Sequence, residues 1–237
     1  MRGNLVAMSV FFCYNITMFY ALKLVNLSGW ILLAFIVAYI LAVMLAIVFH
    51  EFSHAYVATK FGDPTPRLMG RLSLNPAKHF DLFGFISFFI IGFGWAKPVI
   101  VNPLNFRNFR KGQRFVALAG VTTNLVLCIL FSALSFFLSP ILAESSNVFL
   151  IFLYYFINYF TIINLALAIF NLLPIFPLDG FNFIKSFMRP DNAFVQTMER
   201  YGPIFLLVLI ITPFFDWFYY FAINGILSGL DLFWGLF

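Results

Sequence analysis

A long apolar run, from about Gly29 to Phe49, most strongly limits what this chain can fold into. The run holds no charged residue, and other stretches also approach the roughly 20 apolar residues that cross about 30 Å of hydrocarbon. The whole sequence is 63% apolar and only 10% charged, which is not typical of any soluble globular domain. Because backbone groups in lipid must find partners within the protein, we expect a polytopic membrane protein built of helices.

The apolar stretches define the expected fold class, an all-α polytopic membrane protein with about five to six transmembrane helices. The segment 83–96 is too short to cross and has basic residues on both sides, so we expect a re-entrant or β-hairpin membrane segment there. An amphipathic surface helix is the alternative for this segment. The stretch 222–237 is too short and too interrupted to assign. The expected spans are 4–22, 29–56, 115–138, 148–172 and 201–221.

The chain is expected to form a single integral-membrane domain over 1–237, with its core at about 29–221 and an additional helix within 1–28. Asn4 to Leu22 is too long, and too polar in its middle, for the apolar region of a signal peptide. No small-residue cleavage site follows it. We therefore expect a retained span.

Basic residues predict the orientation in the membrane. No Lys or Arg lies between Phe115 and Ile184, and the loop near Pro140 to Asn147 carries only Glu144. By the positive-inside rule the basic stretches are cytoplasmic and the Glu144 loop lies on the other side, so the net charge of +5 reflects topology and not nucleic-acid binding. The three basic stretches contain Lys60, Arg67, Arg71 and Lys78; Lys97, Arg107, Arg110, Lys111 and Arg114; and Lys185, Arg189 and Arg200.

The sequence His50-Glu51-Phe52-Ser53-His54 closes the apolar run. On a helix the two histidines share one face, about 5–6 Å apart at Cβ, so both imidazoles can reach one Zn²⁺. Glu51 can then take a proton from a zinc-bound water. The alternative is that these are interfacial residues with a chance spacing. Because a charged residue in a span costs roughly 2.5–3.5 kcal/mol, three ionisable groups together favour a metal site.

A catalytic zinc site usually has three protein ligands, so a third is expected beside the histidines. Asp179 stands out because Pro174 and Pro177 break the helix before it, and Gly180 allows a tight turn behind it. We expect its carboxylate to reach the depth of His54. The other acids and histidines are Asp63, Asp81, Glu144, Asp191, Glu199, Asp216, Asp231 and His79.

Asn124 lies near the cytoplasmic end of the expected span 115–138, only about 15 Å along a helix from Arg114. Its side chain could serve the metal site, or it could form a hydrogen bond between helices; both interpretations stay open. Gly120, one turn earlier, would let another backbone come close. The residues expected to serve only packing or the membrane interface are His79, Asn158, Asn164 and Trp95.

Several motifs between about residues 45 and 205 resemble those of the site-2 protease family of intramembrane zinc metalloproteases, in its compact form without PDZ or CBS domains. The resemblance implies that His50, His54 and Asp179 hold one zinc ion and that Glu51 is the catalytic base. It also implies that Asn124 contacts the substrate backbone or the developing oxyanion. The motifs are HEFSHAY from His50, GDP from Gly62, GRLSLNP from Gly70, GWAKPV from Gly94, NP from Asn102, AGVTTN from Ala119 and NLLPIFPLDG from Asn171.

The expected function is hydrolysis of peptide bonds within or near transmembrane segments of membrane proteins, in regulated proteolysis or clearance of signal-peptide remnants. A helical substrate hides its carbonyls, so it must be locally extended, and pairing with 68–74 or 83–96 would hold it open. The expected setting is the cell membrane, with the active site toward the cytoplasm. Two alternatives are an ion transporter whose polar path uses the same side chains and an inactive relative that binds membrane clients.

Overall fold

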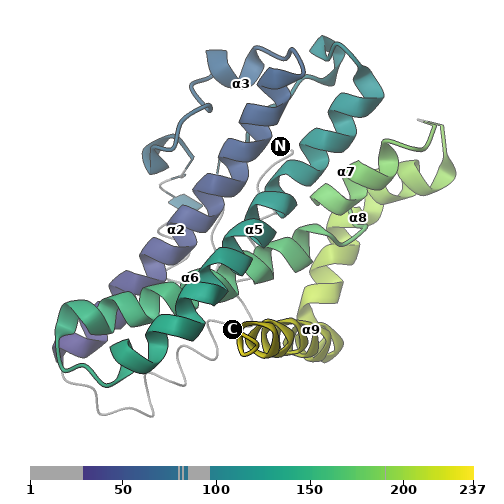
Figure 1. The fold of residues 1–237 in the computed structure, drawn as a ribbon. Coiled ribbons are helices and arrows are strands. Elements are labelled where there is room, and N and C mark those ends of the chain that lie inside the picture. Colours follow the sequence, from purple (N-terminus) through teal and green to yellow (C-terminus); the bar gives the residue numbers. More distant parts are fainter. Residues whose placement is uncertain (1–28, 80, 82, 85–96, 190) are drawn as a thin grey trace.

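The computed structural model describes residues 29–79, 81, 83–84, 97–189 and 191–237. The described part of the chain is helical and contains no strand (Figure 1), so the expected all-α class is confirmed there. The expected first span and most of the expected hairpin segment lie outside the described residues. The helices are α2 (Gly29–Lys60), α3 (Thr65–Leu68), η1 (Pro76–Lys78), η2 (Pro103–Asn105), α5 (Phe109–Ala143), α6 (Val148–Asn171), α7 (Asp179–Lys185), α8 (Ala193–Ile211) and α9 (Pro213–Trp234).

Within the described ranges, four helices are long and apolar enough to cross a membrane: α2, α5, α6 and α8. The first three confirm the helices expected over 29–56, 115–138 and 148–172, and two of them run beyond the expected ends. The shortest of the three, α6, has 24 residues. At 1.5 Å per residue it is about 36 Å long, which exceeds the hydrocarbon thickness of about 30 Å.

Small side chains on α2 allow close packing of the three longest helices, α2, α5 and α6, which contact one another pairwise. Ala38, Ala42 and Ala46 lie one turn apart on one face of α2, and none has exposed area. Ala42 and Ala46 belong to an apolar core that also holds Cys128 of α5 and Phe160 of α6. Because lipid is as apolar as these side chains, close van der Waals packing holds the helices together.

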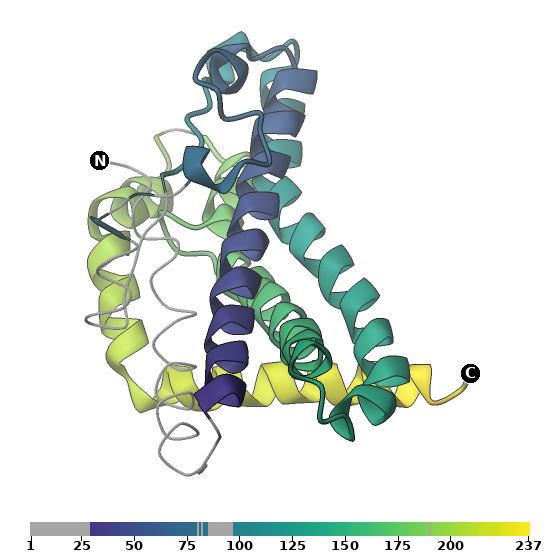
Figure 2. The same cartoon turned by 90° about the vertical axis from the view of Figure 1, so that its left-hand side faces the viewer.

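The predicted single span over 201–221 is wrong, because the structure divides this stretch between two helices. α8 ends at Ile211 and α9 begins at Pro213. The proline ring disfavours the helical region for the preceding residue, and Thr212 is extended, with φ −81° and ψ 139°. α9 also takes in most of the unassigned stretch 222–237, and Figure 2 shows it lying crosswise to α2, at the level of the bundle where α2 begins.

Two hydrogen bonds attach α9 to the bundle. The Tyr219 hydroxyl donates to the Ala166 carbonyl of α6, and the Trp234 indole N–H donates to the Ser132 hydroxyl of α5 over 2.9 Å. In the water-free interior of a membrane such groups need partners within the protein. α9 is therefore fixed to both helices that it crosses.

Asp63, just after α2, is fully buried and holds two parts of the chain together. Its carboxylate accepts hydrogen bonds from the N–H and hydroxyl of Thr65, at 3.1 and 2.6 Å. It also accepts from the backbone N–H of Asn102 at 2.7 Å and from the side-chain amide of Asn105 at 2.8 Å. Burial alone would raise the pKa of Asp63, but the hydrogen bonds from Asn105, Thr65 and Asn102 lower it below its usual 3.8.

We expect Asp63→Asn to lower the melting temperature, because its amide would face donors, and a buried unpaired donor costs about 1–3 kcal/mol. The folded-state pKa of Asp63 is lowered, so its stabilisation is fully present above 3.8 and is lost as the pH falls through the lower folded value. The difference in melting temperature from the wild type, measured in detergent, should therefore shrink at acidic pH. The control is Asp191→Asn, at an exposed carboxylate. A difference that does not depend on pH would contradict this assignment.

Candidate metal centre

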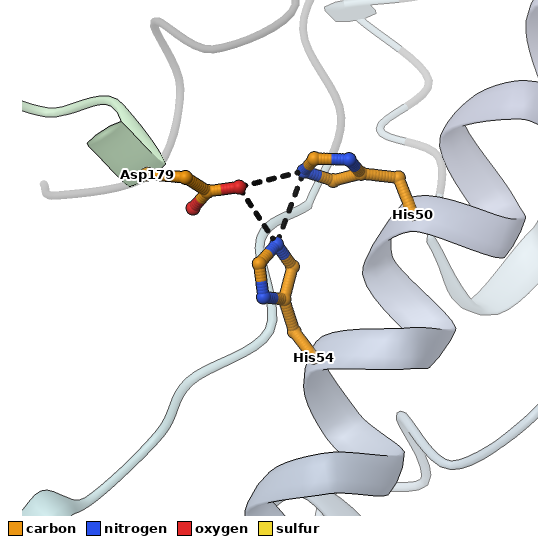
Figure 3. A group of neighbouring side chains, drawn as sticks. All are labelled: His50, His54 and Asp179. Carbon is orange, nitrogen blue, oxygen red and sulfur yellow. Dashed lines mark hydrogen bonds and ion pairs between the residues drawn. The ribbon is translucent and has the colours of Figure 1, made fainter. Parts of the chain in front are cut away.

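His50 and His54 lie one turn apart on α2, and both are buried. Their Nε2 atoms are 3.0 Å apart. Figure 3 shows both rings directed toward Asp179, whose Oδ2 lies 3.3 Å from His50 Nε2 and 3.2 Å from His54 Nε2. The structure thus brings together the three residues that the sequence singled out, with a potential ligand atom from each within 4.8 Å of the others.

The turn between α6 and α7 carries Asp179 to the histidines. α6 ends at Asn171, before the two prolines, and Asp179 is the first residue of α7. Gly180 permits this turn, since a Cβ there would lie 2.2 Å from the Leu172 carbonyl oxygen. Leu178, immediately before Asp179, is fully buried and anchors the turn in the core. As expected, the carboxylate reaches the depth of His54.

Hydrogen bonds on the far side of each ring determine which nitrogen carries the proton. His54 Nδ1 lies 2.8 Å from the Val116 carbonyl oxygen of α5. A backbone carbonyl only accepts, so Nδ1 of His54 carries a proton, and in the neutral imidazole Nε2 then has a free lone pair. His50 Nδ1 lies 2.6 Å from Asn124 Oδ1, and donation to this oxygen leaves Nε2 of His50 free as well.

Three electron-rich atoms therefore meet at one buried point. When both imidazoles are neutral, their two Nε2 atoms have no hydrogen to share across 3.0 Å. The buried Asp179 Oδ2, at 3.3 and 3.2 Å from them, then has no donor hydrogen to accept among the described residues. A cation is the group that would satisfy all three. Two imidazole nitrogens and one carboxylate oxygen form a ligand set that suits Zn²⁺ and matches known catalytic zinc sites.

Gly120 of α5 makes room for this group. A Cβ at Gly120 would lie 2.3 Å from His50 Cε1 and 2.5 Å from His54 Nε2. The sequence analysis expected this glycine to let another backbone come close; the three atoms nearest to its Cβ position belong to the two imidazole rings of α2. Any larger residue would displace the histidines.

Glu51 faces a cavity of about 780 Å³ that the three clustered side chains also line. Its Oε2 accepts the backbone N–H of Val99 at 2.9 Å, which holds the carboxylate against the cavity wall. The wall residue Val99 belongs to the segment that Asp63 ties to the end of α2. The other apolar lining residues include Pro98, Ile100, Val101, Pro103, Phe106, Val116, Ala117 and Pro177, and the other polar ones are Gln113, Asn182 and Lys185.

Asn124 is fully buried and is not among the residues that line the cavity. Its amide nitrogen donates to Asn164 Oδ1 of α6 at 2.7 Å, so an interhelical hydrogen bond is present in addition to the contact with His50. The sequence analysis missed Asn164, which was expected only to pack. The available signal was an amide side chain within a largely apolar span, a signal that Asn158 shares. Trp95 lies outside the described residues, whereas His79 and Asn158 contact Ser73 and Ser135.

Comparisons with known proteins point to one protein family. The family model described as "Peptidase family M50" matches residues 138–210. YwhC of Bacillus subtilis, which is named as a zinc metalloprotease, is 39% identical over 175 residues, covering 73% of this chain and 80% of that protein.

Two mycobacterial proteins called Rip2, also named as zinc metalloproteases, are similar. The protein of Mycolicibacterium smegmatis is 30% identical, with 79% of this chain and 74% of that protein covered. The protein of Mycobacterium tuberculosis strain H37Rv is 29% identical, with 74% and 68% covered. No solved structure gives a significant match. With 39% identity to YwhC over most of both proteins, the chain belongs to peptidase family M50, the site-2 protease family of zinc-dependent membrane proteases.

Proposed function

We propose that His50, His54 and Asp179 hold the zinc ion of this intramembrane metalloprotease and that Glu51 is its catalytic base. The observation that carries the proposal is the convergence of two imidazole nitrogens and one buried carboxylate oxygen, all within 4.8 Å of one another, beside Glu51 in one cavity. The alternatives of ion transport and inactive client binding are not favoured. The relatives are named as metalloproteases, and the proposed base and all three proposed ligands are present.

The proposed chemistry needs a Lewis acid and a base. Bound zinc supplies the first, by polarising the scissile carbonyl and lowering the pKa of water. Glu51 takes the proton of the attacking water and passes it to the leaving amine. The Val99 N–H positions the Glu51 carboxylate for this transfer, because it holds Oε2 at the cavity wall. The substrate contact that the resemblance implies for Asn124 stays a prediction.

The substrate is a membrane protein, and we infer that it is cut within or near a transmembrane segment. The cavity is lined largely by apolar side chains, which suits such a segment. Of the two segments expected to pair with an extended substrate, 68–74 does not line the cavity and most of 83–96 lies outside the described residues. Residues 98–101, which have no helical structure and do line it, fit this role better.

We further propose that the site opens toward the cytoplasm of a cell whose plasma membrane the protein crosses several times. Lys60 ends α2 just beyond His54, and the first turns of α5 carry Arg110, Lys111 and Arg114. The loop after α5, at the opposite end, holds Glu144. The positive-inside rule therefore supports a cytoplasmic position for the basic end that includes the cavity.

Substitutions of the proposed ligands and of the proposed base should affect zinc content differently. We expect His50→Ala, His54→Ala and Asp179→Ala to lose both zinc and cleavage, because each removes a ligand. Glu51→Gln should keep zinc while cleavage falls by about 10²–10⁴-fold, because only the base is gone. The measurements are zinc stoichiometry and cleavage of a single-span substrate by purified protein, with and without a chelator.

His79→Ala is the matched control for these ligand variants, because it removes the third histidine of the chain, whose ring contacts Ser73 instead. It should retain zinc. A stoichiometry near that of the wild type in Asp179→Ala would remove Asp179 from the ligand set.

Single cysteines should report the orientation. In a background without Cys13 and Cys128, we expect cysteines at Lys60, Arg110 or Arg189 to react with an impermeant thiol reagent only from the cytoplasmic side. A cysteine at Ser146, in the loop after α5, should react only from the other side. All four positions are exposed, so accessibility depends on topology alone. The reverse pattern would place the site on the other face.

Cleavage should depend on how easily the substrate helix opens. Each unpaired backbone group in lipid costs several kcal/mol, so a stable poly-Leu span should resist entry. Gly costs about 1 kcal/mol and Pro about 3 kcal/mol in a helix interior relative to Ala. We therefore expect Gly, Asn or Pro within a turn or two of the cut to raise the rate, and replacement by Leu to lower it severalfold. Rates that follow only the side chain at the cut would contradict this and indicate a side-chain pocket.

A further inference from the structure

A chain of buried amide groups runs from α6 through α5 to the first histidine of α2. Asn164 Nδ2 donates to the Phe160 carbonyl oxygen at 2.7 Å, and Asn164 Oδ1 accepts from Asn124 Nδ2 at 2.7 Å. Asn124 Oδ1 in turn lies 2.6 Å from His50 Nδ1. Asn124 and Asn164 have no exposed area, and 4% of His50 is exposed, so water does not compete for these bonds.

The chain of hydrogen bonds has a direction, because its first member can only accept. The Phe160 carbonyl requires the amide nitrogen of Asn164 on its side, which turns Asn164 Oδ1 toward Asn124. That oxygen requires the amide nitrogen of Asn124, and Asn124 Oδ1 is then left for His50. The Ala46 carbonyl, 3.5 Å from Asn124 Nδ2, favours the same orientation. His50 must therefore carry its proton on Nδ1.

We propose that Asn164 is a positioning residue that sets the tautomer of His50 through Asn124 and so keeps His50 Nε2 free to bind zinc. The proposal rests on the ligand set put forward above. Reversing either amide would bring two acceptors or two donors to within about 3 Å in a buried site and leave those groups without hydrogen bonds, which is unfavourable there. His54 needs no such chain of hydrogen bonds, because the Val116 carbonyl determines its tautomer directly.

The same helix offers a matched control for Asn164. Asn158 donates to the carbonyl of Tyr154 at 2.8 Å and accepts from the Ser135 hydroxyl of α5 at 2.9 Å. Asn164 likewise bonds a carbonyl four residues earlier and a polar side chain of α5. Asn158→Leu therefore removes an equivalent interhelical contact, but one that does not lead to His50.

The test compares zinc affinities of the full-length purified variants by chelator competition, alongside their melting temperatures. We expect Asn164→Leu to bind zinc about 10–100-fold more weakly than the wild type, as is typical when a residue that orients a ligand is lost. Asn158→Leu should bind zinc as the wild type does. Equally weakened zinc binding in both variants, or unchanged zinc binding in Asn164→Leu, would overturn the proposal.

A rescue variant separates positioning from packing. Asn124→Asp places a carboxylate beside His50 Nδ1, which accepts the same proton without help from Asn164. Asn124→Asp combined with Asn164→Leu should therefore recover zinc affinity to within about threefold of the wild type. Failure to recover would assign Asn164 to packing and overturn the proposal. Zinc retained in His50→Ala would instead overturn the ligand set, so the two failures are distinguishable.

Discussion

Inside a membrane a polar group has no water to bond, and this constraint organises the site from its outer contacts inward. The outer nitrogen of His54 bonds a backbone carbonyl, and that of His50 bonds the amide of Asn124. These contacts use every proton that the two rings carry as neutral imidazoles. What is left unpaired is one lone pair on each ring and Asp179 Oδ2, and these three atoms face one another. The same hydrogen bonds that stabilise the helix packing thus leave a site for a cation.

The small residues around the site matter as much as the ligands. Gly120 lies against both imidazole rings, and Gly180 lies against the Leu172 carbonyl just after α6. At either position the Cβ of a larger residue would clash with these atoms. Ala46, on the buried face of α2, allows α5 and α6 to approach in the same way. The ligands meet because α2, α5 and α7 each carry a small residue where the chain segments come closest.

The wall of the cavity depends on a contact outside the long helices. Asp63 binds the backbone of Asn102 and the side chain of Asn105, which anchors the segment that also includes Val99. The Val99 N–H then holds the Glu51 carboxylate. A buried aspartate beyond the end of α2 thus links the stability of the fold to the position of the proposed base. The arrangement gives the charged carboxylate of Asp63 a structural role separate from that of Asp179.

Features that depend on neighbours along the chain follow directly from the amino-acid sequence. The apolar runs specify helices because lipid leaves the backbone no other partner, and the four-residue spacing of His50 and His54 puts both rings on one face. A proline in the sequence does not by itself show where a helix ends. Pro140 and Pro203 lie inside α5 and α8, whereas Pro213 starts α9. A proline is tolerated in a membrane helix when surrounding groups bond the freed carbonyl, and those surroundings are not local.

Which distant polar groups meet depends on how the helices pack and does not follow from the sequence. Asn158 and Asn164 are alike in sequence, since each lies within the apolar helix α6 and bonds the carbonyl four residues before it. The packing of α6 against α5 places one opposite Ser135 and the other opposite Asn124. Helical periodicity repeats identically along a span, whereas the contacts between spans depend on how their side chains fit together. The physical reason is that local propensity sets the helices, and interhelical packing sets the neighbours of each polar side chain.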